Sequence, residues 1–237
     1  MDRIKKTILA ALAVIGLLIG FSSNSEAAPY FAIQVSDGTN SLLIQDNLNY
    51  QDLDPRSGII DWSGSVGDWN IKVQVTQTFD MLGNASAPRI DLASANNPTA
   101  AGTLTIDVSE VGLLASAANF TSAQVGIGGT TLPNGSGTIT AQLFGGNSNV
   151  LLDKSNFIVS TEPLAGNAAG VFGGSAIGGF TPSAGNFSLT SEVVIHHDVA
   201  GLATFNNNAV AVPEPSTLIF LGSCLLGAGM VSRKVKI

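Results

Sequence analysis

The chain has 237 residues, of which 45% are hydrophobic and only 11% are charged. This length suits one sizeable domain or two small ones, and so little charge beside 27 glycines indicates an extracellular β-rich protein rather than a cytosolic enzyme. Between Pro29 and Val212 four basic residues face fourteen acidic ones, which gives a net charge of 4 − 14 = −10. This acidic balance excludes nucleic-acid binding, which requires a basic footprint. The only cysteine, Cys224, lies outside that range, so no disulfide forms within it.

The first 27 residues have the three parts of a secretory signal peptide. Lys5 and Lys6 precede an apolar core over residues 7–21, and Ser25-Glu26-Ala27 fits a small-x-small cleavage site. We therefore predict that signal peptidase cuts after Ala27. A retained N-terminal anchor is the alternative, but the apolar core is shorter than the roughly 20 residues that a membrane span needs.

Four segments alternate apolar and polar residues with the period of two expected of a half-buried strand. In the longest, residues 69–79, one face is apolar and the other carries Asn70, Lys72, Gln74 and Thr76. The other three are residues 102–108, 137–144 and 187–197. Weaker strand signals cover residues 30–35, 41–45, 58–63, 89–93, 120–127, 156–161 and 202–205.

Turn signals support an antiparallel arrangement of these strands. Asp37-Gly38 predicts a hairpin between the strands at residues 30–35 and 41–45, and Asn134-Gly135 predicts another tight turn. About ten short strands at spacings of about 8–20 residues predict an all-β domain over residues 28–209, an antiparallel β-sandwich or jelly-roll-like fold.

Three segments depart from the strand pattern. Residues 108–118 are the only stretch that could host a short helix, although Gly112 weakens it. Residues 164–185 are rich in Gly, Ala and Ser and predict either an ordered crossing or a flexible loop. The polar run Asn206-Asn207-Asn208 and residues 209–212 are interpreted as the end of the domain and a short spacer.

Both histidines of the chain stand together in His196-His197-Asp198. Neighbours in a strand point to opposite faces, so the two imidazoles cannot share one metal ion without a bulge. We therefore favour strand-end residues without a ligand, and predict no metal site here.

A stretch rich in aspartate could supply oxygen ligands to calcium. Solvated loop carboxylates are the favoured interpretation, because the glycine and spacing of an EF-hand loop are missing, but structural calcium stays open. The carboxylates concerned are Asp46, Asp52, Asp54, Asp61 and Asp68.

Trp62 and Trp69 could form a platform on which a sugar ring stacks. Trp69 lies on the apolar face of its segment and Trp62 follows two isoleucines, so burial in the core is favoured. A carbohydrate-binding module remains the first alternative function and requires at least one of these two side chains to be exposed.

No catalytic motif is recognisable in the chain. A G-x-S-x-G nucleophile elbow does not occur, and residues 28–209 contain no cysteine. We therefore predict no enzymatic activity and no cofactor. A secreted hydrolase is the second alternative and would need His196 or His197 in a cleft with a carboxylate or a serine.

The C-terminal residues 210–237 combine three parts in a fixed order. The turn Pro213-Glu214-Pro215 is extended and accessible, because prolines cannot lie within a helix or a central strand. An uncharged apolar run follows over residues 218–231, which is short for a bilayer span. The basic end should stay in the cytoplasm and fix the orientation. It consists of Arg233, Lys234 and Lys236.

This tail resembles the PEP-CTERM sorting signal of exported bacterial proteins: Val-Pro-Glu-Pro at 212–215, a membrane segment, then a basic end. The resemblance implies processing by an exosortase, a membrane-embedded cysteine transpeptidase-like enzyme that cuts near the motif. It also implies a transient anchor in the inner membrane, followed by a place at the cell surface or outside the cell. There the role expected is structural or adhesive, in the envelope or in a biofilm matrix of exopolysaccharide.

Overall fold

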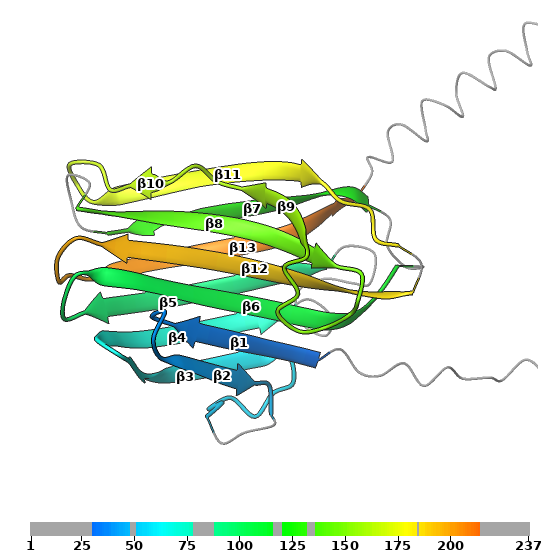
Figure 1. Cartoon of the computed structure of the whole chain (residues 1–237), viewed down its shortest axis with the longest axis horizontal. Coiled ribbons are helices and arrows are strands. Elements are labelled where there is room, and N and C mark those ends of the chain that lie inside the picture. The colour runs from blue at the N-terminus through cyan, green and yellow to red at the C-terminus, as the bar shows by residue number, and fades with distance from the viewer. Residues whose placement is uncertain are drawn as a thin grey trace, which may run out of the picture.

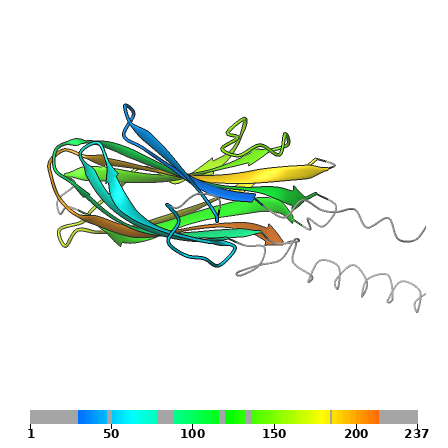
Figure 2. The same cartoon turned by 90° about the horizontal axis from the view of Figure 1, so that it is seen from below.

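The computed structural model describes residues 30–47, 51–77, 88–115, 120–131, 136–183 and 185–213. All regular elements in these ranges are strands, arranged in two sheets whose pairs are antiparallel throughout. Figure 1 shows one sheet in front of the other, and Figure 2 shows the two layers from the side. The predicted antiparallel β-sandwich is therefore confirmed.

The strands divide between the sheets as follows. Sheet A contains β1 (Tyr30–Ser36), β2 (Ser41–Gln45), β6 (Gly102–Leu114), β8 (Gly137–Gly146), β9 (Asn156–Ser160), β10 (Leu164–Ala165) and β12 (Asn186–His197). Sheet B contains β3 (Ile59–Val66), β4 (Trp69–Gln77), β5 (Arg89–Pro98), β7 (Phe120–Thr130), β11 (Val171–Gly179) and β13 (Ala203–Pro213).

The last two strands lie in the middle of their sheets. Sheet A has the order β10-β8-β12-β6-β1-β2, with β9 also paired to β8, and sheet B has the order β11-β7-β13-β5-β4-β3. From β5 to β8 successive strands alternate between the sheets, as in a jelly roll. The fold therefore needs the C-terminal strands β12 and β13 to complete both sheets.

The core lies between the sheets and follows from the alternation of the strands. In β4 the residues Trp69, Ile71, Val73 and Val75 are buried, whereas Asn70, Lys72 and Gln74 on the opposite face are exposed. The same period of two in β6, β8 and β12 directs apolar side chains inward from sheet A. Burying these side chains is the main stabilising contribution to the sandwich.

The first predicted hairpin is confirmed. β1 and β2 pair antiparallel, and Gly38 between them has a φ of 88°. Asp37 Oδ1 accepts hydrogen bonds from the backbone amides of Thr39 at 2.8 Å and Asn40 at 2.6 Å, which lowers the pKa of the Asp37 carboxyl. The turn Asn134-Gly135 lies outside the described residues.

Two of the segments that depart from the strand pattern are strands in the structure. The helix considered over residues 108–118 is wrong as far as Leu114, because β6 runs through that point and pairs with both β1 and β12. Gly112, with a φ of 83°, lies where the β6–β12 register shifts. Residues 164–185 contain β10 and β11, so the ordered alternative holds there.

The spacer that we expected over residues 209–212 is also part of the sandwich. β13 continues to Pro213 and is paired on one side to β5 and on the other to β7. The polar run at 206–208 does not end the domain, because Asn207 is buried and only its two neighbours face outward.

Candidate functional site

β13 includes Pro213, the first residue of the predicted sorting turn, although we expected proline to be excluded from a central strand. The last pair of the β13–β7 ladder joins Pro213 to Phe120, so Pro213 ends a central strand of sheet B. No helix long and apolar enough to cross a membrane occurs between residues 30 and 213, insofar as the structure describes them. The remaining predicted tail and cleavage residues lie outside the described ranges: Glu214, Pro215, Arg233, Lys234, Lys236 and Ala27.

His196 lies on the outer face of sheet A. Its side chain is 49% exposed, and its Nε2 is 3.2 Å from Asp198 Oδ1. Its Nδ1 is 3.1 Å from the hydroxyl of Thr103, the residue opposite it on β6. These contacts are those of an exposed strand-end residue.

His197 points the other way, into the core, as the alternation predicts. It is fully buried, and its ring stands edge-on to Trp69 with centroids 5.6 Å apart. Burial, and then the charge of His196, lower the pKa of His197, so its imidazole is neutral at pH 7. The two histidines therefore cannot act on one ligand.

The aspartates of the loop between β2 and β3 mostly organise its backbone. Asp52 Oδ1 accepts hydrogen bonds from the amides of Asp54 at 3.0 Å and Asp61 at 3.1 Å. The guanidinium of Arg56 bonds to Asp54 and lowers the pKa of that carboxyl to about 2. Within the described ranges no three His, Cys, Asp or Glu gather as metal ligands. Asp46 also accepts from a backbone amide, that of Gly58, at 2.8 Å.

The two tryptophans offer no surface for a sugar. Trp62 is 6% exposed and Trp69 is 2% exposed, and both belong to the core between the sheets. Neither tryptophan can therefore provide the exposed stacking platform that we expected of a carbohydrate-binding module.

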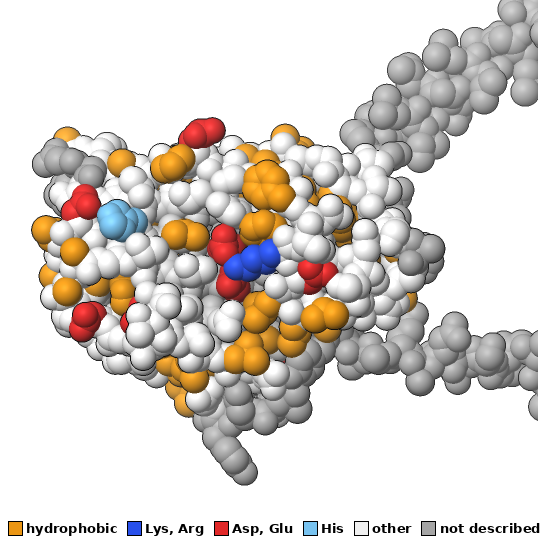
Figure 3. Space-filling model, viewed as in Figure 1, with side chains coloured by type: hydrophobic (Ala, Val, Ile, Leu, Met, Phe, Trp, Pro, Cys, Tyr) orange, Lys and Arg blue, Asp and Glu red, His pale blue; other side chains and the backbone are white. Residues whose placement is uncertain are grey.

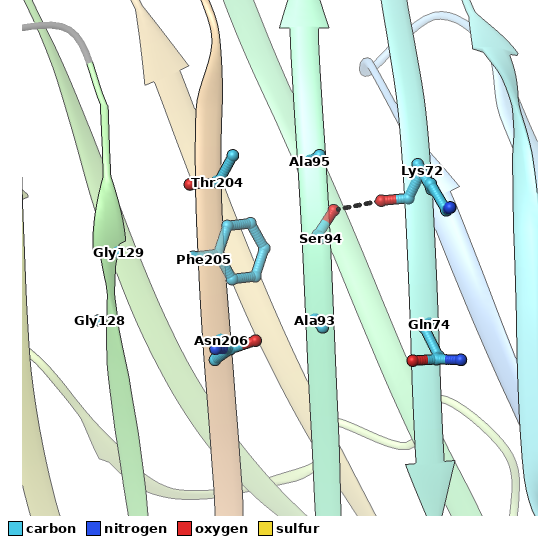
Figure 4. Close-up of a pocket in the computed structure, with 10 residues that line it drawn as sticks. All are labelled: Lys72, Gln74, Ala93, Ser94, Ala95, Gly128, Gly129, Thr204, Phe205 and Asn206. Atoms are coloured by element: carbon cyan, nitrogen blue, oxygen red, sulfur yellow. Dashed lines mark hydrogen bonds between the residues drawn. The ribbon is translucent and has the colours of Figure 1, made fainter.

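The outer face of sheet B is hollowed by a groove across β4, β5, β13 and β7 (Figure 4). Its volume is about 340 Å³. Ala93 and Ala95 of β5 form the floor between β4 and β13, and Gly128 of β7 lies on the far side of β13, where it is paired with Asn206. Because alanine has a short side chain, the longer side chains of β4 on one side and of β13 on the other rise above Ala93 and Ala95 and form walls.

The groove walls are polar and carry one positive charge. Gln74, Asn206 and Lys72 are exposed side chains of β4 and β13, and Thr204 lies beside them. Amide side chains both donate and accept hydrogen bonds. Phe205 also contributes to the lining but is only 3% exposed, so it offers almost no face for stacking.

A second hollow of about 430 Å³ continues the groove along the same strands. It shares Gln74 and Asn206 with the first and adds Asn208 and the ion pair between Arg89 and Asp91, whose atoms approach to 3.0 Å. Together the two hollows form an open, hydrogen-bonding channel, which we call the sheet B groove.

The outer face of sheet A carries a different group of charges (Figure 3). Asp107 and Glu192 stand opposite each other on β6 and β12, and Lys154 reaches both carboxylates, with Nζ 2.7 Å from Asp107 Oδ1. Burial raises the pKa of Asp107 to about 6 despite the ammonium beside it. Although burial opposes it, bonding to both carboxylates raises the pKa of Lys154. This cluster fastens the 147–155 loop to the sheet.

The sequence reading missed the sheet B groove as a site. It placed Lys72 and Gln74 together on the polar face of their strand, and the structure confirms that placement. The other lining residues come from β5, β7 and β13, which are distant from β4 in sequence, and we interpreted residues 206–208 as the end of the domain. The signal for a strand in this run is the apolar residue at every second position on either side of it, Ala203 and Phe205 before and Ala209 and Ala211 after.

Comparison with known proteins identifies the tail. Residues 211–234 match the family model of the PEP-CTERM protein-sorting motif, which confirms the predicted sorting signal. No curated protein matches the chain significantly.

Several solved structures are similar to the chain at low sequence identity and with TM-scores below 0.5. A carbohydrate-binding module, TmCBM27, whose title describes specific mannan recognition, is 13% identical over 66% of this chain and 86% of its own, with a TM-score of 0.30. The adhesin domain of Epf from Streptococcus pyogenes is 16% identical over 78% of this chain and 60% of its own, with a TM-score of 0.37. Carbohydrate-binding modules of the β-sandwich superfamily are represented at 12% identity, 76% and 72% coverage and a TM-score of 0.35.

Proposed function

We propose that this PEP-CTERM protein, which its sorting motif marks as exported and membrane-transiting, serves a structural or adhesive role at the cell envelope or in an extracellular polysaccharide matrix. Exosortase would process it after signal peptidase has cut near Ala27. The observation that carries the proposal is the motif at residues 211–234.

Each part of the tail has a role in the proposal. Pro213, Glu214 and Pro215 form the turn that the exosortase recognises, and residues 218–231 hold the substrate in the membrane. Arg233, Lys234 and Lys236 keep the end of the chain in the cytoplasm. Exosortase acts on the chain, so the chain needs no catalytic activity of its own for this role.

The sheet B groove is the surface that we assign to the matrix polysaccharide. Its volume lies in the range of ligand clefts, and its amide and hydroxyl groups suit the many hydroxyls of a sugar chain. Its length across four strands suits an extended polymer better than a compact small molecule. The alternative of stacking on exposed tryptophans is not available to Trp62 or Trp69.

The processing is tested by intact-mass spectrometry of the protein recovered from cells and medium of a bacterium that makes an exosortase. We expect loss of the N-terminal residues up to Ala27 and loss of the tail at or after Pro213, with any added mass identifying the attached group. A mature, localised protein that still ends at Ile237 would contradict exosortase processing.

The groove is tested by co-sedimentation of the protein with the purified exopolysaccharide of its host. We expect Asn206→Ala to weaken binding by about fivefold, since one hydrogen bond contributes about 1 kcal/mol. Gly128→Val should weaken binding further, because its side chain would occupy the part of the groove beside Asn206. Asn97→Ala is the matched control, because Asn97 is exposed on β5 but does not line the groove. Equal binding by all three variants would exclude the groove.

A further inference from the structure

The edge of sheet B at β11 is long and uncharged. β11 covers nine residues, Val171–Gly179, and pairs only with β7 among the described strands. Figure 1 shows it at the margin of the sandwich. Edge strands of natural monomers are usually protected by charge, proline, a bulge or a covering loop, and β11 contains neither a charged residue nor proline.

The direction of the backbone groups of β11 follows from two hydrogen bonds at its ends. Thr131 donates from its amide to the carbonyl of Gly170 at 2.8 Å, and Phe180 donates to Thr121 at 3.0 Å. In an antiparallel pair these groups alternate sides, so the even-numbered residues of β11 bond to β7. The odd-numbered residues turn their amides and carbonyls outward.

Asn167 covers the first of these outward positions. Its amide donates to the carbonyl of Val171, and its Oδ1 accepts from the Val171 amide, both at 3.0 Å. Beyond it, Gly173, Ser175, Ile177 and Gly179 are exposed, and no described residue bonds to their outward backbone groups.

The opposite edge of sheet B is protected. At the middle of β3 the carbonyl of Asp61 accepts from the amide of Leu53 at 2.9 Å, and its amide donates to Asp52 at 3.1 Å. The edge strands of sheet A are short, with five residues in each of β2 and β9. The open edge at β11 is therefore a specific feature of the fold.

From this contrast we propose that β11 pairs antiparallel with β11 of a second copy of this chain. Both edges are neutral, so the pairing avoids the repulsion that the acidic remainder of the molecule would cause. Centring the pair on Ala176 places Gly173 opposite Gly179 and Ser175 opposite Ile177, which uses every outward position. The two Ile177 side chains, each 61% exposed in the monomer, then become diagonal neighbours.

A two-fold arrangement of this kind closes at the dimer, because it consumes the open edge of both copies. It also extends sheet B continuously from one copy to the other. A different protein that adds its own strand to β11 is the competing occupant, and the experiment separates it from a second copy.

The test measures the mass of the purified full-length chain in mild detergent by light scattering, at concentrations up to about 100 µM, because a small interface gives modest affinity. We expect a dimer for the wild type and for Ser175→Ala, which keeps the outward amide. Ser175→Pro should be monomeric, since it removes that amide at an edge position where proline is tolerated. Ile177→Lys gives a second, independent break, and Leu202→Lys, at an equally exposed apolar residue, is its control.

Site-specific cross-linking then tests the register. In a Cys224→Ser background, Ser175→Cys in one copy and Ile177→Cys in another should form a disulfide, because directly paired positions meet the required geometry. Ser63→Cys on β3 should not cross-link to Ser175→Cys. A monomeric wild type, or a dimer that persists in both Ser175→Pro and Ile177→Lys, would overturn the proposal and leave β11 to another partner.

Discussion

Gly128 and Gly129 are neighbours in β7, but a side chain would meet very different surroundings at the two positions. A Cβ at Gly129 would clash with the carbonyl oxygen of Thr204 and lie 2.7 Å from the Cα of Phe205, both in the adjacent strand. At Gly128 the nearest atom, the carbonyl oxygen of Phe172, is 3.7 Å away. Only the second position has room for a methyl group.

The first prediction compares alanine at these two glycines. Gly129→Ala should lower the free energy of unfolding by about 1–3 kcal/mol, because two backbones must move apart. Gly128→Ala should change it by less than about 0.5 kcal/mol, as expected of an open surface position. Urea unfolding followed by tryptophan fluorescence measures both, and equal losses would show that the close approach of β7 and β13 is not limiting.

Asp107 makes the stability depend on pH. Its pKa is raised from 3.8 to about 6 by burial, so between these values the folded state binds the proton more tightly than the unfolded chain. The free energy of unfolding should therefore fall as the pH rises from about 4 to about 6. The contribution of this group is on the order of 2 kcal/mol.

Replacing the Asp107 carboxyl tests the predicted direction of this change in stability with pH. Asp107→Asn should flatten the fall in stability between about pH 4 and pH 6, since the amide does not titrate. Glu162→Gln, at an exposed carboxyl outside the cluster, should leave the profile unchanged. A wild-type stability that rises steadily over this interval would mean that pairing with Lys154, rather than burial, dominates at Asp107.

At the scale of elements, β13 connects the fold to its sorting signal. It is the central strand of sheet B, paired from Ala203 to Val210 with β5 and onward to Pro213 with β7. A cut within this strand would remove a partner from both neighbours and open the core, where Ala209 and Ala211 are buried. Cleavage at or after Pro213 leaves the sandwich complete.

This arrangement predicts the length of the mature chain. Its C-terminal peptide, read by mass spectrometry after proteolysis, should contain Val210 and end no earlier than Pro213. A gene stopped after Phe205 should yield a product that is digested at least about tenfold faster than one stopped after Thr217, because the open form is much more populated. A stable mature protein that ends before Val210 would contradict the central role of β13.

Element prediction succeeded where side chains alternate and failed where the pattern carries no such signal. In residues 69–77, alternating apolar and polar side chains indicate which face of the strand is buried. The strand predicted over residues 41–45 has the same bounds as β2. Residues 108–114 combine apolar spacing that also suits a helix, and only pairing with β1 and β12 on both sides makes them a strand. Glycine-rich β11 has almost no periodicity to interpret, since four of its nine residues are glycines without a side chain.

The candidate site was less predictable than the fold for a related reason. The alternation within its own strand assigns Lys72 to an outer face. Asn206 could not be assigned in this way, because it belongs to a run of three asparagines that we did not interpret as a strand. Their proximity depends on the strand order β13-β5-β4, which joins residues far apart in the chain. Local periodicity contains no information about that order.

Charged residues are unevenly distributed along the chain. Residues 111–152 contain no Asp, Glu, Lys or Arg, whereas half of the acidic residues between Pro29 and Val212 lie in the loop before β3 and in the strands β5, β6 and β12. The neutral part includes β7 and lies next to β11. Like charges therefore keep most surfaces of two copies apart and leave the β11 edge as the side on which they can approach.

The last prediction rests on both the groove and the β11 dimer. Antiparallel edge pairing relates two copies by an axis perpendicular to the sheet, so both sheet B grooves face the same way on one continuous sheet. Binding of the second groove to a polymer is then intramolecular and raises the apparent affinity by about a hundredfold or more. Ser175→Pro should lose that gain on immobilised exopolysaccharide while its affinity for a short soluble oligosaccharide stays unchanged, as biosensor titrations can measure. If Ser175→Pro weakens both equally, it has damaged the groove itself; if it weakens neither, the two grooves do not engage one polymer together.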